Sequence, residues 1–152
     1  MERILVAVDE DEQAPRVIEL AGEVAQACGA ALTVCHVMPV ERYHRIEEQQ
    51  RHDQVVVPFS MTDGEMQAAE LAAGYARPLT ATGVTFTTTG RVGDPAPTIV
   101  GLAREIDADL IIMGFEALKG LERIRALGSV SRAVMETTRR PVMVVPAVHE
   151  GA

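Results

Sequence analysis

Four short, mainly apolar runs are spaced along the chain, at residues 4–8, 32–38, 110–113 and 142–145. Runs of this length are typical of strands that are buried on both faces of a parallel sheet. The segment 84–89 differs, because valine and phenylalanine alternate there with threonines. Its pattern predicts a strand with one wetter face, at an edge of the sheet.

Apolar residues at helical spacing occupy the intervals between these runs. Pro15 is suited to open the first helix, because a residue at the helix start needs no partner for its N–H. The periodic pattern continues to residue 28, and Gly29 follows it as a C-terminal stop. Asp63 is the expected cap of a second helix that ends near residue 76, before Pro78.

Two further helices follow the third and fourth strands. Asp94, with a proline after it, is expected to start the helix that carries a buried stripe over residues 99–106. Ser129 or Ser131 is expected to cap the last helix. Arg139 and Arg140 would then complement the dipole at its C-terminus, before a proline ends it.

Strict alternation of strands and helices predicts an α/β fold of three layers, α/β/α. We expect a five-stranded parallel sheet of order 3-2-1-4-5 with right-handed crossovers. In such sheets a ligand binds beyond the carboxyl ends of the strands, where the strand order reverses. Here that crevice lies between strands one and four, flanked by the loops after Val8 and Met113. We expect a single domain over residues 1–148, with a tail at 149–152.

A long connection at residues 39–62 interrupts this rhythm. It is rich in charge as far as Asp53 and then carries an apolar patch at residues 55–59. A helical piece is expected around residues 41–52. Long connections in compact domains are often functional. Two interpretations stay open, a solvated excursion that covers the sheet edge, or a surface for a protein partner or a lid.

Composition narrows the class of protein. The net charge of −8 repels nucleic-acid phosphates, and the aromatic content of 3% offers little for base stacking. No apolar run approaches the roughly 20 residues that span a bilayer. Cys28 and Cys35 lie in apolar segments without C-x-x-C spacing, which predicts two reduced, buried thiols. We therefore expect a cytoplasmic protein that contacts neither nucleic acid nor membrane.

Short motifs follow one another in a characteristic order along the whole chain. The motifs are Val8-Asp9, His36-Val37, Gly93-Asp94-Pro95, and the segments at residues 108–114, 128–131 and 140–146. Together they resemble the universal stress protein family, whose fold is Rossmann-like and similar to that of the adenine nucleotide alpha hydrolases.

The resemblance implies an adenine nucleotide site, with ATP as the ligand. In the nucleotide-binding branch of the family, a glycine-bearing loop after the fourth strand holds the phosphates. A loop that ends at a helix N-terminus can do so because free N–H groups and the helix dipole point at one spot. Asp9 could also ligate Mg²⁺ together with the phosphates. The implied nucleotide-binding residues are Asp9, Val37, Gly114, Gly128, Ser129, Val130 and Ser131.

Two features depart from the nucleotide-binding pattern. Ala117 stands where the family loop has its middle glycine, and the interval from Gly114 to Gly128 is one residue longer. Four consecutive acidic residues, 9–12, also crowd the mouth of the crevice and would repel a triphosphate. The loop residues Lys119, Arg123 and Arg125 could offset that repulsion, or could form a solvated face.

Two functions therefore stay open. The first is a dimeric stress-response protein that binds ATP, with at most very slow hydrolysis because no general base or arginine finger is evident. The second is a family member without nucleotide that acts as a protein-interaction dimer, in part through residues 39–62. A nucleotidyl-transfer enzyme on a related fold is the enzymatic alternative. The last strand is apolar and at an edge, which invites two-fold pairing through Val142, Met143, Val144 and Val145.

Overall fold

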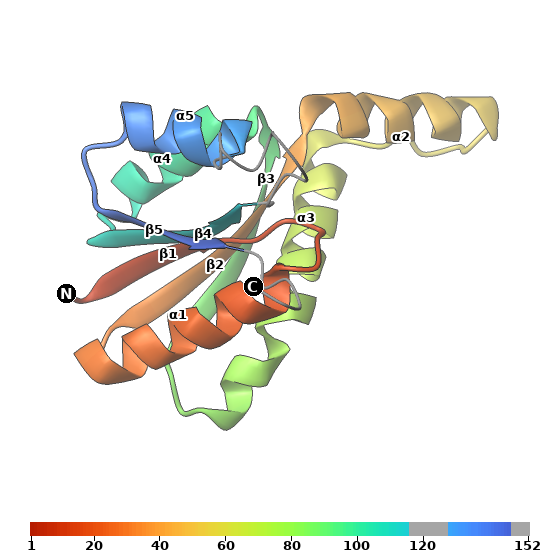
Figure 1. Ribbon diagram of the computed structural model, residues 1–152. Coiled ribbons are helices and arrows are strands. Elements are labelled where there is room, and N and C mark those ends of the chain that lie inside the picture. The colour runs from red at the N-terminus through yellow and green to blue at the C-terminus, as the bar shows by residue number, and fades with distance from the viewer. Residues whose placement is uncertain (116–127, 147–152) are drawn as a thin grey trace, which may run out of the picture.

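The computed structural model describes residues 1–115 and 128–146. Within these ranges, five parallel strands form one sheet of order β3-β2-β1-β4-β5 (Figure 1). The fold class and the strand order predicted from the sequence are confirmed. The strands are β1 (Arg3–Ala7), β2 (Ala31–Pro39), β3 (Phe86–Gly93), β4 (Leu110–Phe115) and β5 (Val142–Pro146). The helices are α1 (Ala14–Cys28), α2 (Val40–His52), α3 (Met61–Ala76), α4 (Pro95–Glu105) and α5 (Ser129–Thr137), with a short 3₁₀ helix, η1 (Arg77–Ala81).

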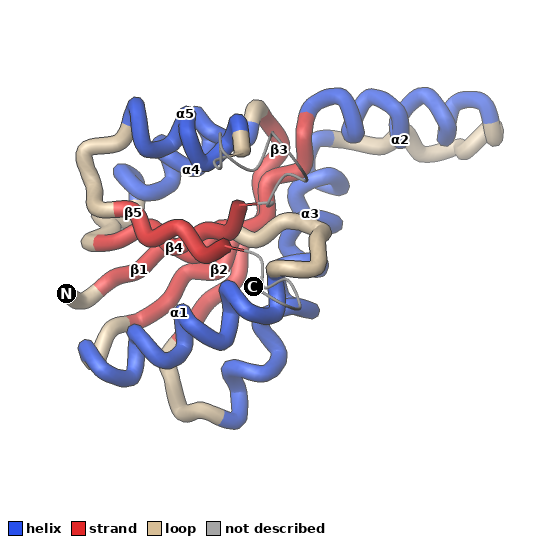
Figure 2. Tube along the Cα trace, in the orientation of Figure 1, coloured by secondary structure: helices blue, strands red, loops and turns tan. Residues whose placement is uncertain are grey.

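The sheet is the middle of three layers (Figure 2). The helices α1 and α3 cover one face, and α4 and α5 cover the other. Successive residues of β1 alternate between the two cores, with Ile4 and Val6 toward α1 and Leu5 toward α4 and α5. Strands of this kind are apolar without interruption because both of their faces are buried.

The helix boundaries follow the sequence signals in part. Gly29 ends α1 in the left-handed conformation, with φ of 67°, as its position directly after the helical pattern predicted. The cap of α3 is Ser60 and not Asp63. Asp63 is the third residue of the helix and completes a capping box with Ser60. The carboxylate of Asp63 accepts a hydrogen bond from the backbone N–H of Ser60, and the backbone N–H of Asp63 donates to the Ser60 hydroxyl. The sequence contains both residues of this box, but the prediction used Asp63 alone and placed it at the cap position.

The edge strand β3 extends further than its threonine pattern, to Gly93. It pairs along its whole length with β2, which supplies hydrogen bonds beyond the predicted end at Thr89. Helix α3 packs directly on the strand backbone at Gly90, where an added Cβ would lie 2.2 Å from the carbonyl oxygen of Glu65. The extension thus depends on a close helix–strand contact that local propensity does not encode.

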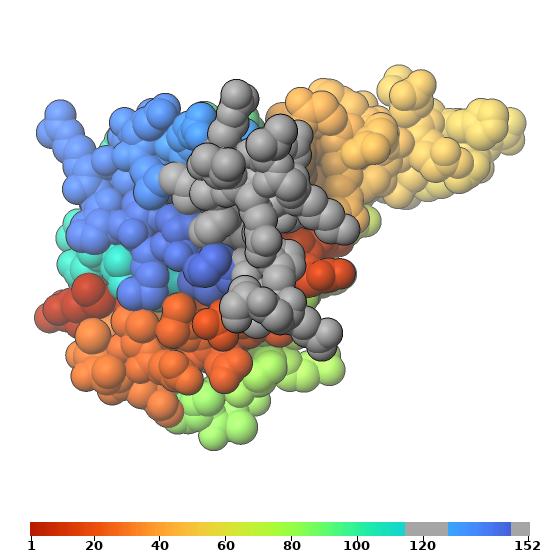
Figure 3. Space-filling model, viewed as in Figure 1, coloured from red at the N-terminus to blue at the C-terminus, as the bar shows by residue number. Residues whose placement is uncertain are grey.

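Residues 40–60 form an arm that projects from the body of the molecule (Figure 3). The predicted helix is present as α2, but it does not lie over the sheet edge. Tyr43 holds the arm at its base, since its ring packs 5.4 Å from that of Phe59 and its hydroxyl donates to the Phe59 carbonyl at 3.3 Å. Val56 is 94% exposed on the returning segment.

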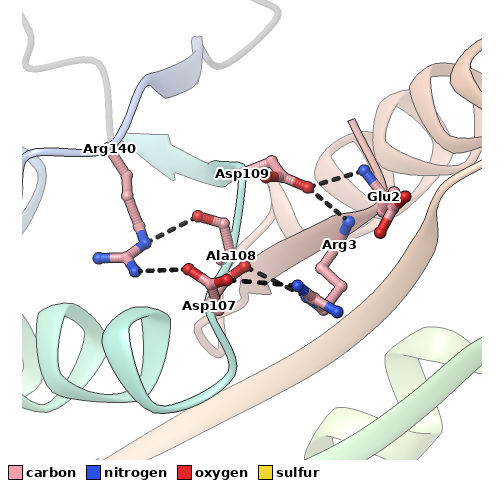
Figure 4. A network of polar contacts seen from close by, with 6 residues as sticks. All are labelled: Glu2, Arg3, Asp107, Ala108, Asp109 and Arg140. Atoms are coloured by element: carbon pink, nitrogen blue, oxygen red, sulfur yellow. Dashed lines mark hydrogen bonds and ion pairs between the residues drawn. The ribbon is translucent and has the colours of Figure 1, made fainter.

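A polar network ties together the starts of β1, β4 and β5 (Figure 4). Asp109 accepts hydrogen bonds from the backbone N–H groups of Glu2 and Arg3, at 2.7 and 2.9 Å. Arg140 donates to the carbonyl of Ala108 at 2.7 Å and pairs with Asp107 at 3.3 Å. We predicted that Arg140 complements the dipole at the C-terminus of α5. That prediction is wrong, because its guanidinium binds Asp107 and the Ala108 carbonyl in the turn before β4.

The two cysteines differ in environment. Cys35 is buried in the sheet, and desolvation raises the pKa of its thiol to about 12. Cys28 is exposed on the last turn of α1, so the prediction of two buried thiols is wrong for this residue. Both are free thiols.

Candidate functional site

A cleft opens at the carboxyl ends of β1, β2 and β4, beside the N-termini of α4 and α5. β1 and β4 are neighbours in the sheet although two other strands separate them along the chain, so the strand order reverses here. Ligands of open α/β sheets bind at such a point. The cleft has a volume of about 230 Å³. Its lining includes all of the residues predicted for the site: Asp9, Val37, Gly114, Gly128, Ser129, Val130 and Ser131.

Asp9 and Asp11 shape the turn between β1 and α1. Asp9 accepts a hydrogen bond from the backbone N–H of Glu10 at 2.8 Å. Asp11 accepts from the N–H groups of Gln13 and Ala14, at 2.9 and 3.1 Å, and so satisfies the start of α1. Asp9 is exposed while it lines the cleft, so its carboxylate can meet both a local N–H and a ligand.

The N-terminus of α5 opens into the cleft without a side-chain cap. The N-cap residue is Gly128, and within the described residues no side chain accepts a capping hydrogen bond there. Ser131 instead donates its hydroxyl hydrogen to the Gly128 carbonyl at 3.1 Å. The prediction that a serine caps this helix is therefore wrong. Uncapped N–H groups at the positive end of a helix dipole form an anion site.

Gly114 is needed for close packing against α1. An added Cβ would lie 2.7 Å from Oε1 of Gln13 and 3.1 Å from Cγ2 of Val17. Its φ is outside the left-handed region, so conformational freedom is not the reason for glycine here. Sequence reasoning missed Gln13, which is 5% exposed and whose Oε1 has no hydrogen-bond partner among the described residues. A polar residue directly before an apolar helix stripe was the available signal.

Val37 and His36 lie near the carboxyl end of β2 and line the cleft. Val37 is buried and belongs to the core under α4. His36 is also buried, and its Nδ1 lies 2.8 Å from the carbonyl oxygen of Val8. Because a carbonyl only accepts, Nδ1 carries the hydrogen, and the ring joins the ends of β1 and β2. The site thus has an apolar wall at β2 and a polar wall at α5.

The acidic mouth is partly neutralised from the arm. Arg42, near the start of α2, pairs with Glu10 at 2.6 Å. The hydrogen bond from Arg42 lowers the pKa of Glu10 below its ordinary value, and the pair raises the pKa of Arg42. Sequence reasoning placed the four acidic residues at the mouth but missed this arginine, because it comes from the connection after β2. The ion pair removes part of the repulsion that an anionic ligand would meet.

Four residues that the sequence analysis named in the loop fall outside the described residues. They are Ala117, Lys119, Arg123 and Arg125, and the tail at 149–152 is also outside. The predicted role of that loop stays a prediction.

A family model for the universal stress protein family matches residues 1–146, which include every described strand and all of the cleft. The chain belongs to the universal stress protein family. Universal stress protein Sll1388 of Synechocystis is 28% identical over 149 residues, covering 94% of this chain and 96% of that protein.

Solved structures of universal stress proteins and of a hypothetical protein share the fold. The hypothetical protein MJ0577, solved as a test case of structural genomics, aligns with a TM-score of 0.73 at 22% identity, over 98% of each chain. The universal stress protein from Archaeoglobus fulgidus, solved in complex with dAMP, aligns with a TM-score of 0.63 at 25% identity, over 95% of this chain and 98% of that one.

In this universal stress protein β5 is one edge of the sheet, since among the described strands it pairs with β4 alone. Val142, Met143 and Val144 are half-buried, so part of each is open to contact. Val145 is buried in the core under α1 and can offer only its backbone. No described helix is long and apolar enough to cross a membrane, and no group of three or more potential metal ligands occurs among the described residues.

Proposed function

We propose that this universal stress protein is a dimeric cytoplasmic regulator that binds an adenine nucleotide, ATP or a relative of it, in the cleft between β1 and β4. The observation that carries the proposal is the uncapped N-terminus of α5, which opens into the same cleft as the apolar end of β2. The phosphates would lie against Gly128, Ser129 and Ser131, and the base against Val37. The complex of the Archaeoglobus fulgidus protein with dAMP supports this choice of ligand.

Asp9 would contribute through a cation. One of its oxygens holds the turn, and its exposed carboxylate fits the pattern in which Mg²⁺ takes one protein carboxylate together with phosphate oxygens. The cation would also reduce the repulsion between Asp9 and a triphosphate. Affinity for ATP should therefore be higher with Mg²⁺ than with EDTA.

A second candidate function is a protein-interaction dimer that binds no nucleotide. The projecting arm favours it, because Val55, Val56 and Val57 are exposed on the returning segment. In that case the sheet edge at β5 would form the dimer, and the arm would contact another protein.

The substitution Ser129→Asp tests the proposed function. Ser129 is the first residue of α5. A carboxylate at this position interacts favourably with the helix dipole, but it also occupies the site where the phosphates would bind. We expect the affinity for ATP to fall about tenfold or more, a loss of roughly 1.4 kcal/mol, while the free energy of unfolding does not fall. Calorimetric titration of ATP measures the first quantity, and urea denaturation measures the second.

Ser129→Ala is the matched control, since it removes the hydroxyl without adding charge. Purified wild-type protein should also release adenine nucleotide when it is denatured. Wild-type protein that holds no nucleotide and fails to bind ATP at millimolar concentration would leave the interaction dimer as the function.

A further inference from the structure

A second polar pocket lies between the C-terminal ends of α4 and α5, at the opposite end of these helices from the cleft. It has a volume of about 370 Å³ and shares no lining residue with the cleft. Its lining contains no aspartate or glutamate. The lining residues are Val100, Arg104, Thr137, Thr138, Arg139 and Arg140.

The three arginines differ in how they are held. Arg140 is fixed, because its Nε donates to the Ala108 carbonyl and its Nη2 pairs with Asp107 (Figure 4). Neither bond uses Nη1, which leaves donor capacity on a guanidinium whose side chain is only 23% exposed. Arg104 and Arg139 form no ion pair with any carboxylate in the described part of the chain.

A hydroxyl adds to this set of donors. The Oγ1 atom of Thr138 accepts a hydrogen bond from the backbone N–H of Arg140 at 3.1 Å, which orients it. Its own hydrogen stays available to a ligand, since a hydroxyl donates one hydrogen while it accepts others. The pocket thus offers fixed and adjustable donors together, a composition that suits the oxygens of a phosphate.

The charge of the whole protein makes this gathering unusual. The chain carries 22 acidic residues against 14 basic ones, yet three of the basic ones share this pocket. Of the nearby carboxylates, Glu105 pairs with Arg91, and Asp107 is shared between Arg140 of this pocket and Arg3. Arg140 has Asp107 as its counter-charge, and the helix C-termini add partial negative charge. The guanidinium groups of Arg104 and Arg139 have no carboxylate partner in the described residues, and a bound anion would relieve the repulsion between the pocket's arginines.

We propose that this pocket is a second ligand site, which binds a phosphate group, either free or as the terminal group of a small phosphorylated metabolite. Arg104 and Arg139 close on the phosphate as charged donors, and the fixed Arg140 with Thr138 orients it. The site is separate from the nucleotide cleft and does not depend on what that cleft binds.

Titration of inorganic phosphate into ¹⁵N-labelled full-length protein tests the proposal, at constant ionic strength kept with sodium chloride. We expect saturable shifts of the Thr138, Arg139 and Arg140 amides. The double variant Arg104→Gln/Arg139→Gln should weaken that binding roughly tenfold or more, since two charge-assisted contacts are lost. Arg77→Gln is the control, because Arg77 is an exposed arginine at the far end of α3.

Glycerol phosphate in place of phosphate tells a bare ion from a metabolite headgroup, and tighter binding of the ester would favour the metabolite. Shifts confined to the amides of residues 128–131 would report the cleft alone and would overturn the proposal. So would shifts at residues 138–140 that never saturate or that persist in the double variant. A purely structural role predicts that the double variant unfolds at lower temperature without phosphate, whereas relief of repulsion predicts no such loss.

Discussion

At the scale of single residues, Gly114 shows how the cleft is built. The residue lies at the end of β4, where the first turn of α1 approaches the strand. The space that a side chain would need is occupied by Gln13 and Val17. Sequence reasoning identified the position as part of a loop that holds phosphates, and that role stays a prediction. The packing of α1, a segment about one hundred residues away, adds a limit on side-chain size that only the structure shows.

Gly114→Ala should destabilise the fold by about 1–3 kcal/mol, because the added methyl group overpacks the contact with α1. Urea denaturation measures the change in the free energy of unfolding. Gly101→Ala is the matched control, since Gly101 is exposed within α4 and an added Cβ there meets nothing within 4 Å. That control should be neutral or should stabilise by up to about 1 kcal/mol. Equal effects at both glycines would contradict the packing argument.

At the scale of elements, side-chain oxygens hold the starts of strands and helices. Ser60 and Asp63 form the box at the start of α3, and Asp109 accepts from two N–H groups at the start of β1. These backbone hydrogen bonds lower the pKa of Asp109, with the N–H of Arg3 as the largest cause. The ionised carboxylate is therefore preferred in the folded state.

Asp109 should make stability depend on pH in a defined direction. A pKa lowered by folding contributes stability that is complete above the unfolded value, near 3.9, and is lost as the pH falls through the folded value. Asp109→Asn should thus lower the free energy of unfolding at pH 7 and cost less at pH 3. Urea denaturation of both proteins at the two pH values measures this. A difference between them that stays constant with pH would refute the assignment.

At the scale of the whole molecule, two surfaces are open to other chains. The edge strand β5 presents half-buried apolar residues, and the arm presents exposed valines at the far side of the sheet. An apolar sheet edge favours pairing with a second copy, since its unpaired backbone groups find partners there. The arm has no such ladder, and it is held at its base by the Tyr43–Phe59 contact and by the ion pair between Arg42 and Glu10.

Val144→Glu should convert a dimer into a monomer or insoluble protein, because it places a charge at the centre of β5. Analytical ultracentrifugation measures the mass in solution. Val56→Glu is the control, as it adds the same charge on the exposed arm. A dimer that persists in Val144→Glu but is lost in Val56→Glu would move the interface from the sheet edge to the arm.

The sequence by itself determined the alternation of elements and the parallel sheet, which follow from apolar runs and helical periodicity. The strand order 3-2-1-4-5 is one of the few ways in which βαβ units can pack, and the place of the cleft follows from that order. It also identified residues that line the cleft from segments far apart in the chain, such as Asp9 after β1 and Ser131 in α5.

Tertiary structure alone decided the contacts between segments that are remote in sequence. The extension of β3, the role of Gly114, the pairing of Arg42 with Glu10 and the placement of Arg140 against Ala108 all belong to this class. Each depends on the distance between two packed elements, and no periodicity within one element records that distance. The fold of this universal stress protein was therefore readable from local pattern, whereas the electrostatics around its two pockets came from packing.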